Sequence, residues 1–259
     1  MKRRIAVRDA ALAGIISMLG LGACGADPDA TPRRSPEIQT NWAAPPRLES
    51  AVFGADGVTL TGAASPGDRI VLTNMAGVSV AATTSSDGVF SLHLAPGDGV
   101  SLHHAEIQSG GSQARAGEWL AITQGPNAVA AVLASGAAVT PLNHAGLLSG
   151  VDYDGSAVLV SGAALPGESV RVSLDDRTAQ AVTADQTGRY VARFASAPPG
   201  SRRFRVEAGD RAQDVVLTLT TPPTELGATG SGVATRIDWP TPGGGFQSSW
   251  VLNASGEDG

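Results

Sequence analysis

Apolar and polar residues alternate in short runs over most of the chain. Val58-Thr59-Leu60 and Ile70-Val71-Leu72 place apolar side chains at positions i and i+2, the pattern of a strand with one buried face. The pattern recurs at Val158-Leu159-Val160 and Val170-Arg171-Val172. Turn residues separate such runs at intervals of about 8–12 residues, which is typical of β-sandwiches. The pattern therefore predicts an all-β protein.

An internal repeat with an offset of 100 residues organises these strands. Residues 61–68 (TGAASPGD) align with residues 161–168 (SGAALPGE), and both copies carry a Pro-Gly pair that suits a type II turn. The alignment continues without a gap through Thr83 with Thr183, Gly88 with Gly188, and Phe90 with Tyr190. Because turn positions and core positions agree together, the repeat predicts one fold used twice.

The repeat also sets the expected domain boundaries. We expect one sandwich over residues 47–123 and a second over residues 146–220. Residues 124–145 are rich in Ala and Val and poor in turns, so they are expected to be a linker, an extra strand pair or a short helix. Residues 221–259 alternate on both sides of a Pro/Gly loop, which predicts a C-terminal β-hairpin rich in Trp, Gly and Pro.

The first 23 residues have the pattern of a secretory signal peptide. Four basic side chains precede an uncharged run over residues 10–21, which is too short for a transmembrane helix of about 20 residues. The run ends in Leu21-Gly22-Ala23-Cys24, which resembles the lipobox of bacterial lipoproteins. The resemblance implies cleavage before Cys24 and lipidation of its sulfur. Cys24 is the only cysteine, so it has no partner for an internal disulfide.

A tether and a location follow from this resemblance. Residues 24–46 contain five prolines and no apolar periodicity, so we expect a lipidated N-terminus and a flexible, semi-extended spacer. The expected location is the bacterial cell envelope, lipid-anchored. Gly25 after the cysteine favours the outer membrane over the inner one under the enterobacterial sorting rule.

The repeat unit itself resembles a known family. A Gly-Ala-Ala-x-Pro-Gly-Asp/Glu segment, a Val/Ile strand and a Thr-x(4)-Gly-x-Phe/Tyr segment are similar to the bacterial Ig-like repeats of surface and secreted proteins. The sandwich repeats of carboxypeptidase regulatory domains are a near alternative. The shared motifs are turn and core positions, so they indicate a fold and no activity. The Ig-like resemblance implies a spacer, adhesive or scaffold module, because members of that family mostly have these roles.

Charge and motif content exclude several classes of function. Without residues 1–23 the chain keeps 14 basic and 23 acidic side chains, and this net charge of −9 argues against nucleic acid as a partner. There is no Gly-x-Ser-x-Gly motif and no phosphate-binding Gly-rich loop before a Lys-Ser/Thr pair. We therefore expect no enzyme activity, no cofactor and no metal.

Three groups of residues nevertheless need a reading. His103 and His104 are neighbours on a predicted strand and should point to opposite faces. Asp152-Tyr153-Asp154 resembles the start of a calcium loop, but the twelfth position is Ala163 instead of glutamate, so a hairpin turn is favoured. Trp119 suits either the core or a glycan platform.

The function expected from these observations is a non-enzymatic envelope lipoprotein that presents tandem Ig-like domains as a scaffold, spacer or adhesive module. The alternative is a lipoprotein that binds glycan or peptide. The expected partners are the membrane, through the lipid, and an envelope protein or glycan. Trp239, Phe246 and Trp250 in the predicted hairpin are candidate partner contacts, and the competing interpretation is that they pack on the second sandwich.

Overall fold

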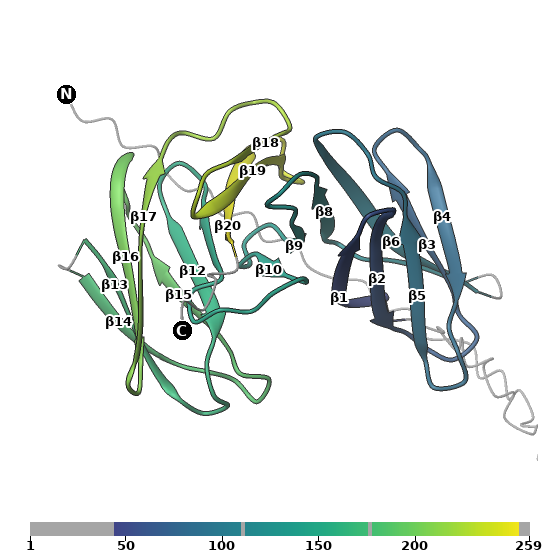
Figure 1. Cartoon of the computed structure of the whole chain (residues 1–259), viewed down its shortest axis with the longest axis horizontal. Helices are drawn as coiled ribbons and strands as arrows, with labels where there is room; N and C mark the ends of the chain where they lie inside the picture. Colours follow the sequence, from purple (N-terminus) through teal and green to yellow (C-terminus); the bar gives the residue numbers. More distant parts are fainter. Residues whose placement is uncertain (1–43, 110–111, 176–177, 254–259) are drawn as a thin grey trace, which may run out of the picture. The chain divides into compact units, whose positions relative to one another are not determined.

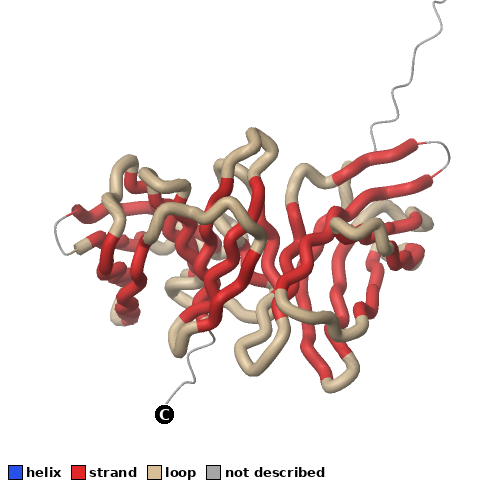
Figure 2. Tube along the Cα trace, turned by 90° about the horizontal axis from the view of Figure 1, so that it is seen from above, coloured by secondary structure: helices blue, strands red, loops and turns tan. Residues whose placement is uncertain are grey.

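Strands, turns and loops make up every part of the chain that the computed structural model describes, namely residues 44–109, 112–175 and 178–253 (Figure 2). No helix occurs within these ranges, and accordingly none there is long and apolar enough to cross a membrane. The predicted all-β class is confirmed.

The first repeat forms two antiparallel sheets. One sheet has three strands in the order β1-β2-β5, and the other has the order β10-β9-β8-β6-β3-β4 (Figure 1). In addition, β7 pairs with β6. The strands are β1 (Arg47–Gly54), β2 (Gly57–Ala63), β3 (Arg69–Asn74), β4 (Ser79–Thr83), β5 (Val89–Leu94), β6 (Val100–Ser109), β7 (Ser112–Arg115), β8 (Trp119–Thr123), β9 (Ala130–Leu133) and β10 (Thr140–Pro141).

The second repeat also forms two antiparallel sheets. Their orders are β15-β12-β11-β20-β19-β18 and β14-β13-β16-β17. The strands are β11 (Gly150–Tyr153), β12 (Val158–Ala163), β13 (Ser169–Leu174), β14 (Thr178–Thr183), β15 (Arg189–Phe194), β16 (Gly200–Ala208), β17 (Arg211–Leu219), β18 (Gly227–Gly230), β19 (Ala234–Pro240) and β20 (Phe246–Leu252).

Both repeats have the same strand topology. In each, the first, second and fifth strands share one sheet, and the fourth, third and sixth share the other. Hairpins within a sheet and crossovers between sheets in this order are typical of an immunoglobulin-like sandwich. The prediction of two tandem Ig-like sandwiches is confirmed.

The aligned turns also match in geometry. Gly88 and Gly188 have φ angles of 76° and 79°, in the left-handed region that favours glycine. A Cβ at either position would lie 2.6 Å from a carbonyl oxygen, that of Ala64 or Ala164 respectively. Equivalent carbonyl groups therefore lie against equivalent turns in the two copies, which explains why glycine stands at both positions.

The segments outside the repeat become parts of the two sandwiches. Of the three alternatives for residues 124–145, the structure has the extra strands: β9 pairs with β8, and β10 pairs with β9. The predicted C-terminal hairpin is present as β19 and β20, and β20 pairs with β11 of the second repeat. The hairpin therefore continues a sheet of the second sandwich instead of standing apart from it (Figure 1).

The buried apolar side chains form three clusters. One fills the first sandwich around Leu60, Ile70 and Phe90, and another fills the second around Val160, Val172 and Phe204. The third combines residues of β6, β8 and β9 with residues of β19 and β20. This third core joins the two repeats, and it directs attention to the junction between them.

Candidate functional site at the junction of the repeats

The third core covers the outer faces of two sheets. Leu102 and Ala121 of the first repeat cluster with Ile237, Trp239 and Val251 of the second. Neighbouring side chains on a strand point to opposite faces, so Leu120 and Ile122 enter the first sandwich while Ala121 enters the third core. The run of consecutive apolar residues in β8 is the pattern of a strand covered on both faces.

Trp239 is the largest side chain of this core. It is 1 % exposed, and its Nε1 donates a hydrogen bond of 2.9 Å to Ser249 Oγ. The bond satisfies the polar atom of the indole, so burying the ring incurs no cost for an unpaired donor. Removing the ring would leave a large cavity between the repeats.

A buried carboxylate connects the two sides of the junction. Asp152 of β11 is 2 % exposed and accepts hydrogen bonds from the Val139 amide at 2.7 Å and Gln247 Nε2 at 3.1 Å. Ser249 Oγ donates a third hydrogen bond to the same carboxylate. Val139 follows β9, and the other two donors belong to β20, so three segments far apart in the sequence converge on this carboxylate.

Burial and hydrogen bonding act on Asp152 in opposite directions. Desolvation raises its pKa to about 6, and the hydrogen bonds from Ser249, Val139 and Gln247 oppose that rise. A raised carboxyl pKa can mark a catalytic acid, but that role requires access for a substrate. The oxygens of Asp152 are occupied by protein donors and shielded from solvent, so the geometry assigns Asp152 to holding the junction.

Two further contacts fix the segment between β9 and β10 against the second repeat. The Val139 carbonyl accepts a hydrogen bond of 3.0 Å from Ser161 Oγ. A Cβ on Gly150 would lie 2.3 Å from Val139 Cγ1, so the close approach of this segment requires glycine there.

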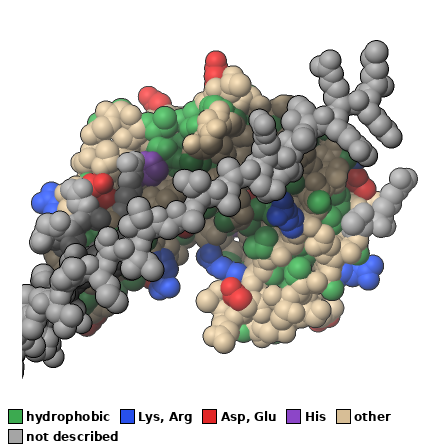
Figure 3. Space-filling model, turned by 180° about the vertical axis from the view of Figure 1, so that it is seen from behind, with side chains coloured by type: hydrophobic (Ala, Val, Ile, Leu, Met, Phe, Trp, Pro, Cys, Tyr) green, Lys and Arg blue, Asp and Glu red, His purple; other side chains and the backbone are tan. Residues whose placement is uncertain are grey.

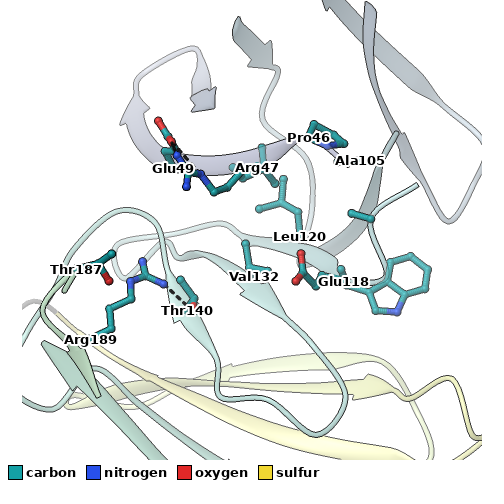
Figure 4. A pocket seen from close by; sticks show the side chains of 13 residues that line it. Pro46, Arg47, Glu49, Ala105, Glu118, Leu120, Val132, Thr140, Thr187 and Arg189 are labelled. Carbon is teal, nitrogen blue, oxygen red and sulfur yellow. Dashed lines mark hydrogen bonds and ion pairs between the residues drawn. The ribbon is translucent and has the colours of Figure 1, made fainter. Parts of the chain in front are cut away.

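A cleft of about 490 Å³ opens beside the junction (Figure 4). Arg47 and Glu49 of β1 line one wall, and Arg189 of β15 lies on the opposite side, where its Nη1 donates a 3.1 Å hydrogen bond to Thr140 Oγ1. Charged, hydroxyl and apolar groups therefore line one concave surface, a mixture that suits an extended polar ligand.

Trp119 also lines this cleft and is only partly buried. Its ring stacks on His104 with a centroid separation of 3.4 Å and an interplanar angle of 34°. Of its two predicted positions, core or platform, the structure places Trp119 at the edge of the third core with part of its surface in the cleft.

The candidate contacts in the hairpin need a correction. Trp239 and Trp250 are 1 % and 5 % exposed, so neither presents an aromatic face to a partner. The guanidinium of Arg236 covers the Trp250 ring at 5.1 Å from its centroid. The competing interpretation, packing on the second sandwich, describes Trp250, while Trp239 packs in the third core. Phe246 alone is partly exposed.

The two aspartates that resemble the start of a calcium loop belong to two separate structures. Asp154 accepts hydrogen bonds from the amides of Ser156 at 2.8 Å and Ala157 at 2.7 Å, which form a local turn, while Asp152 is used at the junction. The favoured reading of a turn describes Asp154. Within the described residues, no group of three or more His, Cys, Asp and Glu side chains is placed to hold a metal ion.

The other residues singled out in the sequence are the histidine pair and Cys24. His103 lies in the first sandwich and is buried, whereas His104 contacts Trp119 at the cleft, so the two rings face opposite ways as expected. Acidic and basic side chains lie in small separate groups on the face shown in Figure 3. Cys24 lies outside the described residues.

Sequence reasoning missed the junction residues Leu102, Val139, Ile237 and Val251. The signal that could have found the junction is the pair of uninterrupted apolar runs at Leu120-Ala121-Ile122 and Ala130-Ala131-Val132-Leu133, which indicate strands covered on both faces and include other members of the third core.

No protein-family model and no curated protein matches the chain. Three solved structures illustrate the likeness to known folds. The BSP domain of a biofilm-associated protein is 14 % identical over 70 % of this chain and 30 % of that chain, with a TM-score of 0.24. A Ca²⁺-stabilised adhesin that helps an Antarctic bacterium bind ice is 12 % identical over 81 % and 66 %, with a TM-score of 0.23.

The integrin-binding protein invasin is 13 % identical over 82 % of this chain and 54 % of its own, with a TM-score of 0.23. The present chain thus spans less than two thirds of each of these three chains. The Ig-like assignment rests on the strand pairings of the two repeats.

Proposed function

We propose that this protein is a non-enzymatic, lipid-anchored module of the bacterial envelope, in which two Ig-like sandwiches act as one stiff scaffold. The lipid on Cys24 would hold the N-terminus at the membrane, and Gly25 after the cysteine favours the outer membrane. The Pro-rich tether would precede the first sandwich.

The observation that carries this proposal is the third core with its buried polar contacts. Tandem domains joined only by a linker reorient freely, because few contacts cross the boundary. Here Trp239 and Ile237 of the second repeat cluster with Leu102 and Ala121 of the first, and Asp152 binds the amide of Val139. A pair of domains locked in this way suits a scaffold or spacer.

Stiffness can be measured with a pair of spin labels. In the full chain carrying Cys24→Ser, Val52→Cys and Val216→Cys are the only two cysteines, and the native side chains there are 67 % and 57 % exposed. Pulsed electron paramagnetic resonance should give one narrow distribution of distances between the two labels, one on each repeat. A matched pair within the second repeat, Val191→Cys and Val216→Cys, sets the width expected of a rigid unit. A much broader distribution between repeats would contradict the scaffold.

The anchor is tested separately. Wild-type protein expressed with its leader should enter the detergent phase, and Cys24→Ser protein should stay in the aqueous phase, because two or three acyl chains give stable membrane binding. Equal partitioning of the two proteins would remove the lipid from the proposal and leave the scaffold to be judged on its own.

The cleft supports a second candidate, a lipoprotein that binds glycan or peptide. Trp119 offers part of an aromatic surface beside Glu118 and Arg47, the mixture used to bind sugars and extended peptides. Soluble peptidoglycan fragments, which carry both chemistries, should change the tryptophan fluorescence of the wild type and leave that of Trp119→Ala unchanged. An equal response of both proteins, or none from either, would argue against the cleft.

A further inference from the structure

The sheet β15-β12-β11-β20-β19-β18 carries a second pocket on its outer face, with a volume of about 450 Å³. Leu159 of β12 and Ala157, which precedes that strand, line it with apolar groups, and the turn at Ser135-Gly136 between β9 and β10 lines it as well. The pocket shares no lining residue with the cleft beside the junction. We call it the outer pocket, and it is open to solvent because several of its lining residues are exposed.

Strand register brings two charged side chains to the outer pocket. Arg193 pairs with Leu159, and Leu159 pairs with Asp152, so these three side chains form a row on one face of the sheet. Asp154 follows two positions after Asp152 and also lines the pocket. The oxygens of Asp152 are occupied by protein donors, whereas Arg193 and Asp154 are exposed. Arg193 and Asp154 are therefore the charged groups that a ligand can reach.

Arg193 has no charge partner of its own. Its guanidinium forms no ion pair and no hydrogen bond with another of the described residues, whereas Arg47, Arg211 and Arg236 each form an ion pair with a carboxylate. The chain has 24 acidic and 18 basic side chains, so an arginine without a carboxylate beside it is notable. A guanidinium presents parallel N–H donors that fit the two oxygens of a carboxylate, so Arg193 suits an anionic group of that shape.

Asp154 supplies the opposite charge. Its Oδ1 accepts hydrogen bonds from the amides of Ser156 and Ala157 and from the Ser156 hydroxyl at 3.2 Å. Desolvation raises the pKa of Asp154, but the hydrogen bonds from Ala157 and Ser156 outweigh it, so the pKa lies below its usual value. The side chain is therefore a carboxylate at pH 7. These three bonds all use Oδ1, and an ammonium group can approach Oδ2.

The separation of the two charges limits the ligand. Arg193 and Asp152 are two strand spacings apart, about 10 Å, and Asp154 lies about 7 Å further along the chain. The Cα atoms of Arg193 and Asp154 are therefore about 12 Å apart, of which their side chains cover roughly 5 Å. The remaining gap of about 7 Å equals the length of two extended residues. A single amino acid is too short to reach both charges.

The first repeat lacks this arrangement. Its equivalent row consists of Val52, Thr59 and His93, and Gly54 takes the place of the second aspartate. His93 already contacts Thr59 Oγ1 at 3.3 Å and a backbone carbonyl at 3.2 Å. The pair of opposite charges on either side of an apolar surface is therefore a property of the second repeat.

We propose that the outer pocket binds a short zwitterionic peptide, two residues long, whose carboxylate pairs with Arg193 and whose ammonium group pairs with Asp154. The middle of the peptide lies on Leu159 and Ala157, so small side chains fit best. The site depends neither on the lipid anchor nor on the stiffness of the two sandwiches, and it is separate from the cleft.

The proposal can be tested with alanyl-alanine on the full chain carrying Cys24→Ser. We expect the backbone amide resonances of Gly136 and Leu159 to shift with added dipeptide until the site is saturated. N-acetyl-alanyl-alanine lacks the ammonium group, and alanyl-alanine amide lacks the carboxylate. Each should bind about three- to fivefold more weakly, because an exposed ion pair contributes at most about a fivefold change in affinity.

Two variants assign the ends of the ligand. Arg193→Gln should bind alanyl-alanine as weakly as the wild type binds the amide, and it should no longer distinguish these two ligands. Asp154→Asn keeps the oxygen that caps the turn, and it should no longer distinguish alanyl-alanine from its acetylated form. Arg171→Gln is the matched control, because Arg171 is an exposed arginine of β13 in the other sheet, and it should bind as the wild type does.

Three results would overturn the proposal. If alanyl-alanine shifts no resonance of the outer pocket, the pocket binds no dipeptide. If the three ligands bind the wild type equally well, the two charges take no part in recognition. If Arg193→Gln distinguishes the ligands as the wild type does, the carboxylate binds elsewhere. The ligand series uses the native side chains, so it decides the question even if a variant fails to fold.

Discussion

The two repeats share one sandwich and extend it on opposite sheets. In the first, β7 and β8 pair in succession with β6, at the place where the single strand β17 pairs with β16 in the second. The first repeat then adds β9 and β10 beyond β8, whereas the second adds β18, β19 and β20 beside β11, in its other sheet. Duplication thus explains the sandwiches, and divergence after the sixth strand explains the junction.

This difference changes what each sheet must bury. A sandwich sheet normally buries one face and leaves the other in water. The extended sheets of this protein bury both faces where they meet, so β8 and β20 are nearly continuous runs of buried residues. Small apolar side chains such as Ala121 and Ala131 let the first sheet approach the large ring of Trp239. The extensions therefore provide an interface that two unmodified copies would lack.

The largest expected effect is that of Trp239→Ala. The variant leaves a cavity in the third core and removes the hydrogen bond that Ser249 accepts, while that hydroxyl still donates to Asp152, so the free energy of unfolding should fall by about 3–5 kcal/mol. Guanidinium unfolding measures the loss. Trp119→Ala is the matched control, because its ring is only partly buried, and it should lose about 1 kcal/mol or less. Similar losses for both variants would mean that the third core contributes little.

The next prediction tests whether the two copies pack equally tightly at the same position. A Cβ on Gly162 would lie 2.0 Å from the Leu147 carbonyl oxygen, and one on Gly62 would lie 2.3 Å from that of Arg47. Backbone atoms yield little, so Gly62→Ala and Gly162→Ala should each destabilise by roughly 2–3 kcal/mol.

The control for this pair is Gly97→Ala, where a Cβ would meet no atom within 4 Å. Its effect should stay within about 0.5 kcal/mol, the range of ordinary surface changes. If only one of the two buried variants proved costly, the two copies would differ in how tightly they pack at this shared position.

The sandwiches were predictable from the sequence because their signals are local. Alternation marked the strands, and Gly88 and Gly188 marked turns whose geometry depends on residues close in the chain. The 100-residue offset reinforced each signal with a second copy. The C-terminal hairpin was predictable for the same reason, since β19 and β20 lie on either side of one Pro/Gly loop.

The junction was not predictable, because its contacts join residues far apart in the sequence. Asp152 contacts Gln247 and Ser249, which are 95 and 97 positions away. Read locally, Asp152 and Asp154 resembled the start of a calcium loop, and nothing nearby showed that one of them faces a buried interface. The same limit applies to Trp239, whose pattern fits an exposed edge or a core equally well until its partner sheet is known.

Asp152→Asn should have an intermediate effect. At pH 4 the Asp152 side chain is the neutral acid, whose two oxygens can both still accept a hydrogen bond, whereas an amide NH₂ in its place cannot accept and must face at least one donor. We expect a loss of about 1–3 kcal/mol at pH 4, measured by guanidinium unfolding. Asp154→Asn keeps the oxygen that caps its turn and should lose much less.

The loss caused by Asp152→Asn should also depend on pH. Burial raises the pKa of Asp152 from 3.8 to about 6 in the folded state, so the folded protein binds this proton more tightly than the unfolded chain. The stability that Asp152 contributes is therefore full below pH 4 and falls as the pH rises to about 6. Because asparagine does not titrate, the gap in free energy of unfolding between wild type and variant should narrow as the pH rises over that range. A gap that widens with pH would show that the carboxylate is more stable ionised at the junction than in the unfolded chain.

The smallest effect exchanges one hydrogen bond between the copies. Thr84 and Ala184 occupy the same position in the two sandwiches, 5 % and 3 % exposed. The Thr84 hydroxyl donates a hydrogen bond of 2.6 Å to the Ser65 carbonyl. The backbone of the loop is the same in both copies, because the Thr84 amide donates to the Asp68 carbonyl at 2.9 Å and the Ala184 amide donates to the Glu168 carbonyl at 3.0 Å. Thr84→Ala should therefore lose about 1 kcal/mol, the net value of one hydrogen bond. Ala184→Thr should raise the free energy of unfolding by a similar amount, because the new hydroxyl would donate a hydrogen bond to the Leu165 carbonyl at the equivalent position. Thermal unfolding of the two variants checks both signs. A loss for Ala184→Thr would mean that the second loop lacks room for the extra atoms, so that the two copies agree in backbone but differ in side-chain packing even within the shared sandwich.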